Sequence, residues 1–266
     1  MPYQLYSYHS NRPSWRRDTY TPRGKLYGIE LEIENPNGRR AILACLPEVR
    51  RCNEFYRPVT ETDGSLNHTG VEIVFPPLAA KTLTNKASLF SRSLENLKEN
   101  GAVASSRTGM HVNVNIADWS RDKAIAFAAV INWVPSKYLT RVGGRRALNH
   151  YSQQCRNGWM ELARGHYRGS ATLRSNRVEV RFPKATLNMT RVKNVLSFLE
   201  FVEEYVEHDS VQQALRTELN DSEVYWRQER SSKSITDAFD AWMAVQKGSK
   251  ARKIRRILKG LDSGES

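Results

Sequence analysis

The chain has 266 residues, of which 39% are hydrophobic and 26% are charged, a composition that excludes an intrinsically disordered protein. Its 41 lysines and arginines outnumber its 28 aspartates and glutamates, so the formal net charge is +13. This excess favours polyanionic partners, which include nucleotides, nucleic acid, anionic lipid and acidic protein.

The first 24 residues are polar, aromatic and rich in arginine, and we expect them to form an N-terminal arm without a secretory signal. The longest apolar run, 124–131, ends at Asn132 and is far shorter than the ~20 residues of a membrane span. The cysteines Cys45, Cys52 and Cys155 are too few for a disulfide framework or a cysteine-based zinc site. We therefore expect a cytoplasmic protein.

Four segments alternate apolar and polar residues with period two, as half-buried β-strands do. They are YGIELEIE at 27–34, GVEIVFPP at 70–77, GMHVNVNI at 109–116 and RVEVRFP at 177–183. Helical patterns occupy 38–46, 85–99, 120–134, 191–207, a segment beginning at Asp209 or Ser210, and 237–245. The expected helix caps are Thr84, Asp118 or Ser120, Thr190 and Thr236. This mixture predicts an α+β fold with a mainly antiparallel sheet, helices on one face and the other face open.

Alternate residues of a strand share one side, so each of the four strands has a polar face. These faces carry Glu30, Glu32, Glu34, Glu72, His111, Asn113, Asn115, Arg177, Glu179 and Arg181. For a single strand, the simplest explanation is that the polar face meets solvent. Glutamate is depleted from ordinary strands, however, and this many carboxylates in one sheet would repel each other unless a cation lay among them.

Carboxylates with a histidine and an asparagine are suitable ligands for Mg²⁺ or Mn²⁺. Arginines beside them supply forked donors for phosphate oxygens. Together they predict a site for a metal-bound nucleoside triphosphate on the open face of the sheet. The sequence has neither G-x-x-x-x-G-K-[ST] nor G-x-G-x-x-G, so a phosphate loop at a helix terminus does not explain nucleotide binding.

Several motifs in order resemble the amidoligase family, within the superfamily of glutamine synthetase and glutamate–cysteine ligase. They are GIELE (28–32), DGSL (63–66), GVEIVFPPL (70–78), GMHVNV (109–114), GGRRALNHYSQQC (143–155) and RVEVRFPKATLN (177–188). The resemblance covers residues 25–207 and implies a catalytic domain with a glutamine synthetase-like curved sheet. Residues 1–24 then form the arm, and 208–266 form a helical, basic C-terminal extension.

The resemblance also implies roles for individual residues. The implied metal ligands are Glu30, Glu32, Glu72, His111 and Glu179. Arg181 would hold the transferred phosphate and Arg177 the nucleotide phosphates. Asn113 stands where the family usually has a second histidine, and its amide can donate and accept hydrogen bonds at the nucleotide. Arg145 and Arg146 either grip a substrate carboxylate or phosphate, or form a solvated helix face.

The implied reaction is an ATP-dependent ligation of a carboxylate to an amine through an acyl phosphate, with Mg²⁺ or Mn²⁺ neutralising the phosphates. The attacking amine must lose a proton, and Asp63 is the candidate base. Asp-Gly-Ser is also a common turn sequence, in which the aspartate only closes the turn. The carboxylate substrate is a small molecule, a peptide or a protein, and the protein can act as an oligomer.

Two other classes of function stay open. Clustered carboxylates and a basic surface also serve a metal-dependent nuclease or nucleotidyl transferase. A non-catalytic nucleic-acid-binding protein would instead leave the acidic strands facing solvent. The segment KGSKARKIRRILKG (247–260) is either a solvated helix face or a contact for nucleic acid.

Overall fold

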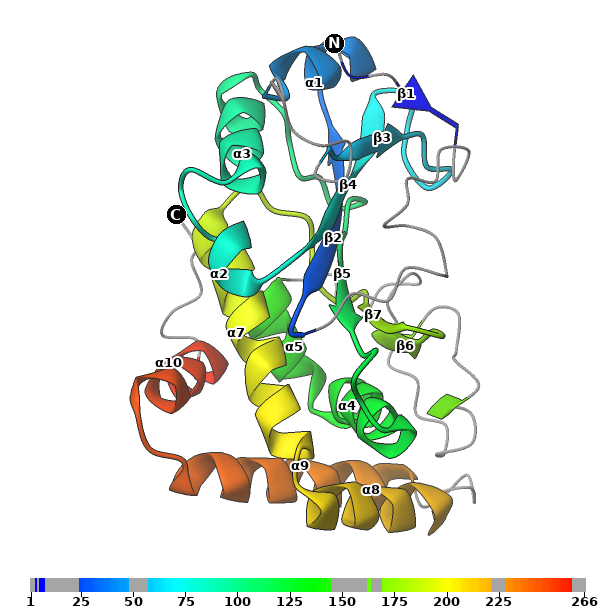
Figure 1. Ribbon diagram of the computed structural model, residues 1–266, viewed down its shortest axis with the longest axis vertical. Coiled ribbons are helices and arrows are strands. Elements are labelled where there is room, and N and C mark those ends of the chain that lie inside the picture. The colour runs from blue at the N-terminus through cyan, green and yellow to red at the C-terminus, as the bar shows by residue number, and fades with distance from the viewer. Residues whose placement is uncertain are drawn as a thin grey trace.

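A single seven-stranded sheet organises the protein, with helices along one side of it (Figure 1). The computed structural model describes residues 3, 5–7, 24–47, 57–144, 162–163, 169–221 and 228–259. The strand order is β1-β3-β4-β2-β5-β7-β6. Neighbouring strands are antiparallel except β1 and β3, which pair in parallel. The predicted α+β class and the mainly antiparallel sheet are therefore confirmed.

The four predicted strands form the centre of this sheet, and short strands extend it. The strands are β1 (Leu5–Tyr6), β2 (Tyr27–Glu34), β3 (Val59–Glu61), β4 (Gly70–Leu78), β5 (Met110–Asn115), β6 (Ala171–Leu173) and β7 (Arg177–Val180). Alternation predicts β2, β4, β5 and β7. It does not reveal β1, β3 and β6, because two or three residues are too few to display a period.

The helices follow most of the predicted segments. They are α1 (Arg39–Cys45), α2 (Ala80–Leu83), α3 (Leu89–Glu99), α4 (Arg121–Trp133), α5 (Ser136–Gly143), α7 (Met189–Val206), α8 (Asp209–Asp221), α9 (Gln228–Val245) and α10 (Ser249–Leu258). Ser120 caps α4 as predicted, because its hydroxyl oxygen accepts from the backbone N–H of Lys123 at 3.2 Å.

Three of the expected caps are wrong. Helix α3 begins after Ser88 rather than Thr84, and the Ser88 hydroxyl accepts from the backbone N–H three residues on at 3.0 Å. Helix α7 begins after Asn188 rather than Thr190, because the Asn188 side chain accepts from two backbone N–H groups of the first turn. Thr236 lies inside α9, which is longer than predicted.

The apolar strand faces and the helices form one core. Ile29, Leu31, Val112 and Val180 are fully buried in it, and each such side chain contributes roughly 1.5–3 kcal/mol relative to an exposed position. Every residue of α4 from 124 to 133 is buried, so this helix lies between the sheet and other helices. The core gives the opposite, polar face of the sheet a rigid base.

The C-terminal helices are packed onto this body. Helices α8 and α9 contact α4, whereas α10 contacts α5 and α7. The apolar side of α10, including Ile254 and Ile257, is fully buried. In the described part of the chain, no helix has the length and apolar character needed to span a membrane.

Candidate metal and phosphate site

Strand register gathers the predicted polar residues on one face. The cross-strand pairs are Glu30 with His111, Glu32 with Glu72, Asn113 with Glu179, and Asn115 with Arg177. Residues directly opposite each other on neighbouring strands have their side chains on the same face. Residues separated by up to about 150 positions in the sequence therefore meet on the polar side of β4, β2, β5 and β7.

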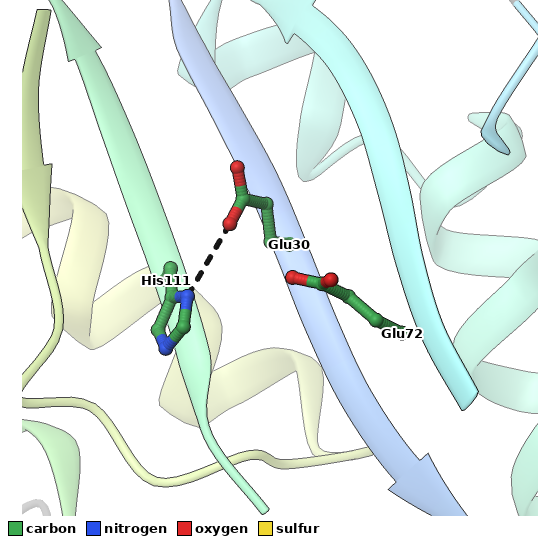
Figure 2. Close-up of side chains that lie close together, drawn as sticks. All are labelled: Glu30, Glu72 and His111. Atoms are coloured by element: carbon green, nitrogen blue, oxygen red, sulfur yellow. Dashed lines mark hydrogen bonds and ion pairs between the residues drawn. The ribbon is translucent and has the colours of Figure 1, made fainter. Parts of the chain in front are cut away.

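Glu30, Glu72 and His111 form a compact cluster contributed by three adjacent strands (Figure 2). One ligand atom from each lies within 4.8 Å of the other two. An octahedral Mg²⁺ with bonds of about 2.0–2.1 Å holds its ligands about 3–4 Å apart, so only small side-chain shifts separate this geometry from a metal site. Two carboxylates and an imidazole suit Mg²⁺ or Mn²⁺ by their chemistry.

Both ring nitrogens of His111 face carboxylates. Nδ1 lies 3.3 Å from Oε2 of Glu30, and Nε2 lies 3.6 Å from Oε1 of Glu32. Nε2 is buried and has no hydrogen-bond partner among the described residues. A buried nitrogen without a hydrogen bond is unfavourable, and coordination to a cation would satisfy it. The imidazole therefore fits the role of a metal ligand.

Asn113 connects the cluster to Arg177. Its Nδ2 donates to Oε1 of Glu30 at 2.9 Å, and its Oδ1 accepts from Nε of Arg177 at 3.0 Å. The asparagine thus fixes the orientation of the Glu30 carboxylate, as hydrogen-bond partners of metal ligands commonly do.

Two arginines hold Glu179, a residue that is 7% exposed. Arg174 donates from Nε and from a terminal nitrogen to Oε2, at 3.2 and 3.1 Å, and Arg181 donates to Oε1. The same Oε1 lies 4.0 Å from Nδ1 of His111, which brings Glu179 to the edge of the cluster. Burial lowers the pKa of Arg181, but the nearby carboxylates, Glu179 first, outweigh it and raise that pKa overall. Sequence reasoning did not identify Arg174.

A row of three glutamates runs beside the cluster. Glu61 of β3 pairs with Glu72, which pairs with Glu32. Each is at most 2% exposed, and Oε2 of Glu32 accepts from the backbone N–H of Gly109 at 2.5 Å. Like charges directly opposite each other destabilise a sheet, so this row suits cation binding. Glu61 was missed because its three-residue strand shows no alternation.

The structure shows Asp63 in a turn. Its Oδ1 accepts from the backbone N–H of Ser65 at 2.6 Å and from the Ser65 hydroxyl, in the loop between β3 and β4. This is the turn-closing geometry that Asp-Gly-Ser favours. A catalytic role for Asp63 stays a prediction. Arg145 and Arg146 lie outside the described residues.

A cavity of about 760 Å³ lies between the start of α4 and the hairpin that joins β6 to β7. Its lining includes Trp119, Arg121, Arg174, Ser175 and Asn176. A volume of this size accommodates a small organic ligand. Because Arg174 also contacts Glu179, the cavity adjoins the polar cluster.

Most of the predicted nucleic-acid segment belongs to α10, and several of its cations have partners within the protein. Lys250 pairs with Glu200 at 3.4 Å, and Arg255 donates to carbonyl oxygens at the end of α9. Lys247, Arg252 and Lys259 are exposed. A nucleic-acid contact through this segment stays a prediction.

A protein-family model matches the chain. A family model described as "Putative amidoligase enzyme" matches residues 36–225, well over half of the chain. The matched region contains Glu72, His111 and Glu179, whereas Glu30 and Glu32 precede it. No curated protein matches the chain.

Proposed function

Because the chain belongs to the putative amidoligase enzyme family, we propose that it is an ATP-dependent ligase that joins a carboxylate to an amine. The family indicates a ligase activity. The observation that supports the finer proposal is the convergence of Glu30, Glu72 and His111 within 4.8 Å, beside arginines that suit phosphate. A ligase that activates a carboxylate with ATP needs both of these elements.

In this proposal, Glu30, Glu72 and His111 hold a Mg²⁺ or Mn²⁺ ion. When bound, the ion neutralises phosphate oxygens and so lowers the barrier to phosphoryl transfer. Glu32 and Glu61 belong to the neighbouring row of glutamates. They would either bind a second metal ion or maintain the negative potential that attracts the first one. Asn113 keeps the Glu30 carboxylate oriented.

Arg177 and Arg181 contact the triphosphate in this proposal. Their forked guanidinium groups match phosphate oxygens, and the raised pKa of Arg181 keeps it charged. The adjoining cavity, which Trp119 helps to line, provides room for the nucleoside.

The reaction proceeds in two steps. An oxygen of the substrate carboxylate attacks the γ-phosphorus, and ADP leaves as the acyl phosphate forms. The amine nitrogen then attacks the acyl carbon, inorganic phosphate leaves, and the amine passes one proton to a base. Arg181 stabilises charge on the transferred group, and Asp63 is the candidate base.

The proposal is tested by incubating the protein with ATP and pools of carboxylic acids and amines, and measuring the release of ADP. We expect a pair of pools to stimulate Mg²⁺-dependent ADP release by the wild-type protein, and mass spectrometry to detect the new amide. Glu179→Gln should abolish the release, while Glu207→Gln, at an exposed glutamate paired with Lys123, should not. If nucleic acid is cut and no pool stimulates ADP release, the ligase proposal is wrong.

A further inference from the structure

Glu179 is fully engaged by arginines. Arg174 makes a two-nitrogen contact with Oε2, at 3.2 and 3.1 Å, and Arg181 donates to Oε1. These are charge-assisted hydrogen bonds, which are stronger than those between neutral groups. The two Arg174 donors fill both acceptor positions of Oε2, so this oxygen has none left for a cation. Arg174 must therefore move before Oε2 of Glu179 becomes a ligand.

Arg174 is the arginine with room to move. Its side chain is 31% exposed, compared with 14% for Arg181. Arg174 lies just beyond the end of β6 and lines the cavity, so its guanidinium can turn from Glu179 into the cavity. Arg181 is more enclosed and lies in the field of Glu30 and Glu32 as well as Glu179.

The cavity favours an anionic ligand. Two guanidinium groups, from Arg121 and Arg174, line it. Among the described lining residues the acidic one is Asp118, which already accepts a hydrogen bond from the backbone N–H of Gly24 at 3.0 Å. An anion there would compete with Glu179 for Arg174.

We propose that Arg174 is a positioning residue that exchanges partners. Without ligand it holds Glu179, and with an anionic ligand in the cavity it turns to that ligand and releases Oε2 of Glu179 to the cation. This inference rests on the proposed function for the cation at Glu30, Glu72 and His111 and for the nucleoside triphosphate as the anion, and it adds Glu179 as a further ligand of that cation. It makes cation binding depend on the ligand, a coupling that must be reciprocal.

Titration with Mn²⁺ in the absence of nucleotide, followed by electron paramagnetic resonance, tests the first half of the exchange. Arg174→Met removes the competing guanidinium, so Mn²⁺ affinity should rise by about fivefold, the scale of a partly exposed ion pair. Arg174→Lys should give an intermediate affinity, because lysine keeps the charge without the two-nitrogen contact. Arg121→Met is the matched control: it removes a charge from the same cavity without touching Glu179, and its effect should be clearly smaller.

Binding of a non-hydrolysable ATP analogue at saturating Mn²⁺ tests the second half. Arg174→Met should weaken this binding even though it strengthens Mn²⁺ binding, whereas a general structural defect would weaken both. Unchanged or weaker Mn²⁺ binding by Arg174→Met overturns the inference, as does unchanged binding of the analogue. If neither wild type nor Arg174→Met binds Mn²⁺, the proposed function fails together with the inference. If wild type binds Mn²⁺ and Arg174→Met binds it no more tightly, only the inference fails.

Discussion

Asn113 donates a hydrogen bond from Nδ2 to Oε1 of Glu30 across the β2–β5 pair, at 2.9 Å. This contact holds a candidate metal ligand in place without occupying the cation position. Asn113→Ala should therefore lower Mn²⁺ affinity by about tenfold, as the loss of a partner of a metal ligand commonly does. Calorimetric titration with Mn²⁺ measures the change.

Asn115→Ala is the matched control for that substitution. Asn115 lies on the same strand and face, but its amide donates to the backbone oxygen of Gly24 at 2.9 Å. Its Mn²⁺ affinity should stay within about twofold of wild type, because its hydrogen bonds with Gly24 and Ala117 touch no candidate ligand. Equal losses in the two variants would show that Asn113 acts only through strand stability.

Asp63→Asn separates catalysis from turn closure. Asparagine keeps the oxygen that accepts from Ser65, so the turn persists while the base is lost. If Asp63 accepts the amine proton, kcat should fall by about 10²-fold or more with little change in thermal stability. Ser65→Ala should do the reverse, with nearly full turnover and a stability loss of about 0.5–1.5 kcal/mol. Full turnover by Asp63→Asn would show that Asp63 closes the turn and is not the catalytic base.

Ile257→Ala tests whether α10 is part of the folded body. Ile257 is fully buried, so the substitution should lower the free energy of unfolding by about 2–4 kcal/mol in urea titrations. Arg252→Gln, at an exposed position on the same helix, should change it by less than about 0.5 kcal/mol. Similar small effects from both would mean that α10 contributes little to the fold.

The Tyr138–Asp240 contact predicts a pH dependence of stability. The Tyr138 hydroxyl donates to Asp240 at 2.8 Å, and burial together with this bond raises the pKa of Tyr138 to about 12 from 10.0. Protonated tyrosine is therefore favoured in the folded state, so its contribution is complete below pH 10 and is lost as the pH rises through about 12. Tyr138→Phe should be less stable than wild type at pH 9, and the difference should shrink by pH 11.5. A constant difference would contradict this assignment.

The two-residue period of side chains along a strand explains why the sequence predicted the polar cluster well. A strand with one buried face must place every second residue on the other face, so the apolar residues of β2 and β5 also locate Glu30 and His111. Glu30 and His111 then meet if their two strands are neighbours in the sheet. The structure provides this with the order β4-β2-β5-β7 at the centre of the sheet.

The residues that were missed depend on tertiary structure. Glu61 belongs to a strand of three residues, whose pairing with β4 cannot be recognised from so short a pattern. Arg174 is positioned by a hairpin, and its contact with Glu179 depends on where that hairpin turns. The start of α3 at Ser88 rather than Thr84 is a choice between two suitable caps, and intrinsic preference alone does not make that choice.

Pulsed electron paramagnetic resonance of Mn²⁺ bound to the nucleotide-free protein tests the central claim most directly. Coordination by His111 would place an imidazole nitrogen next to the ion. The account predicts saturable binding with a ¹⁴N coupling in the wild-type protein. It also predicts loss of that coupling in His111→Asn and weaker binding in Glu72→Gln. Absence of saturable binding, or a ¹⁴N coupling that survives His111→Asn, would show that Glu30, Glu72 and His111 do not form a metal site.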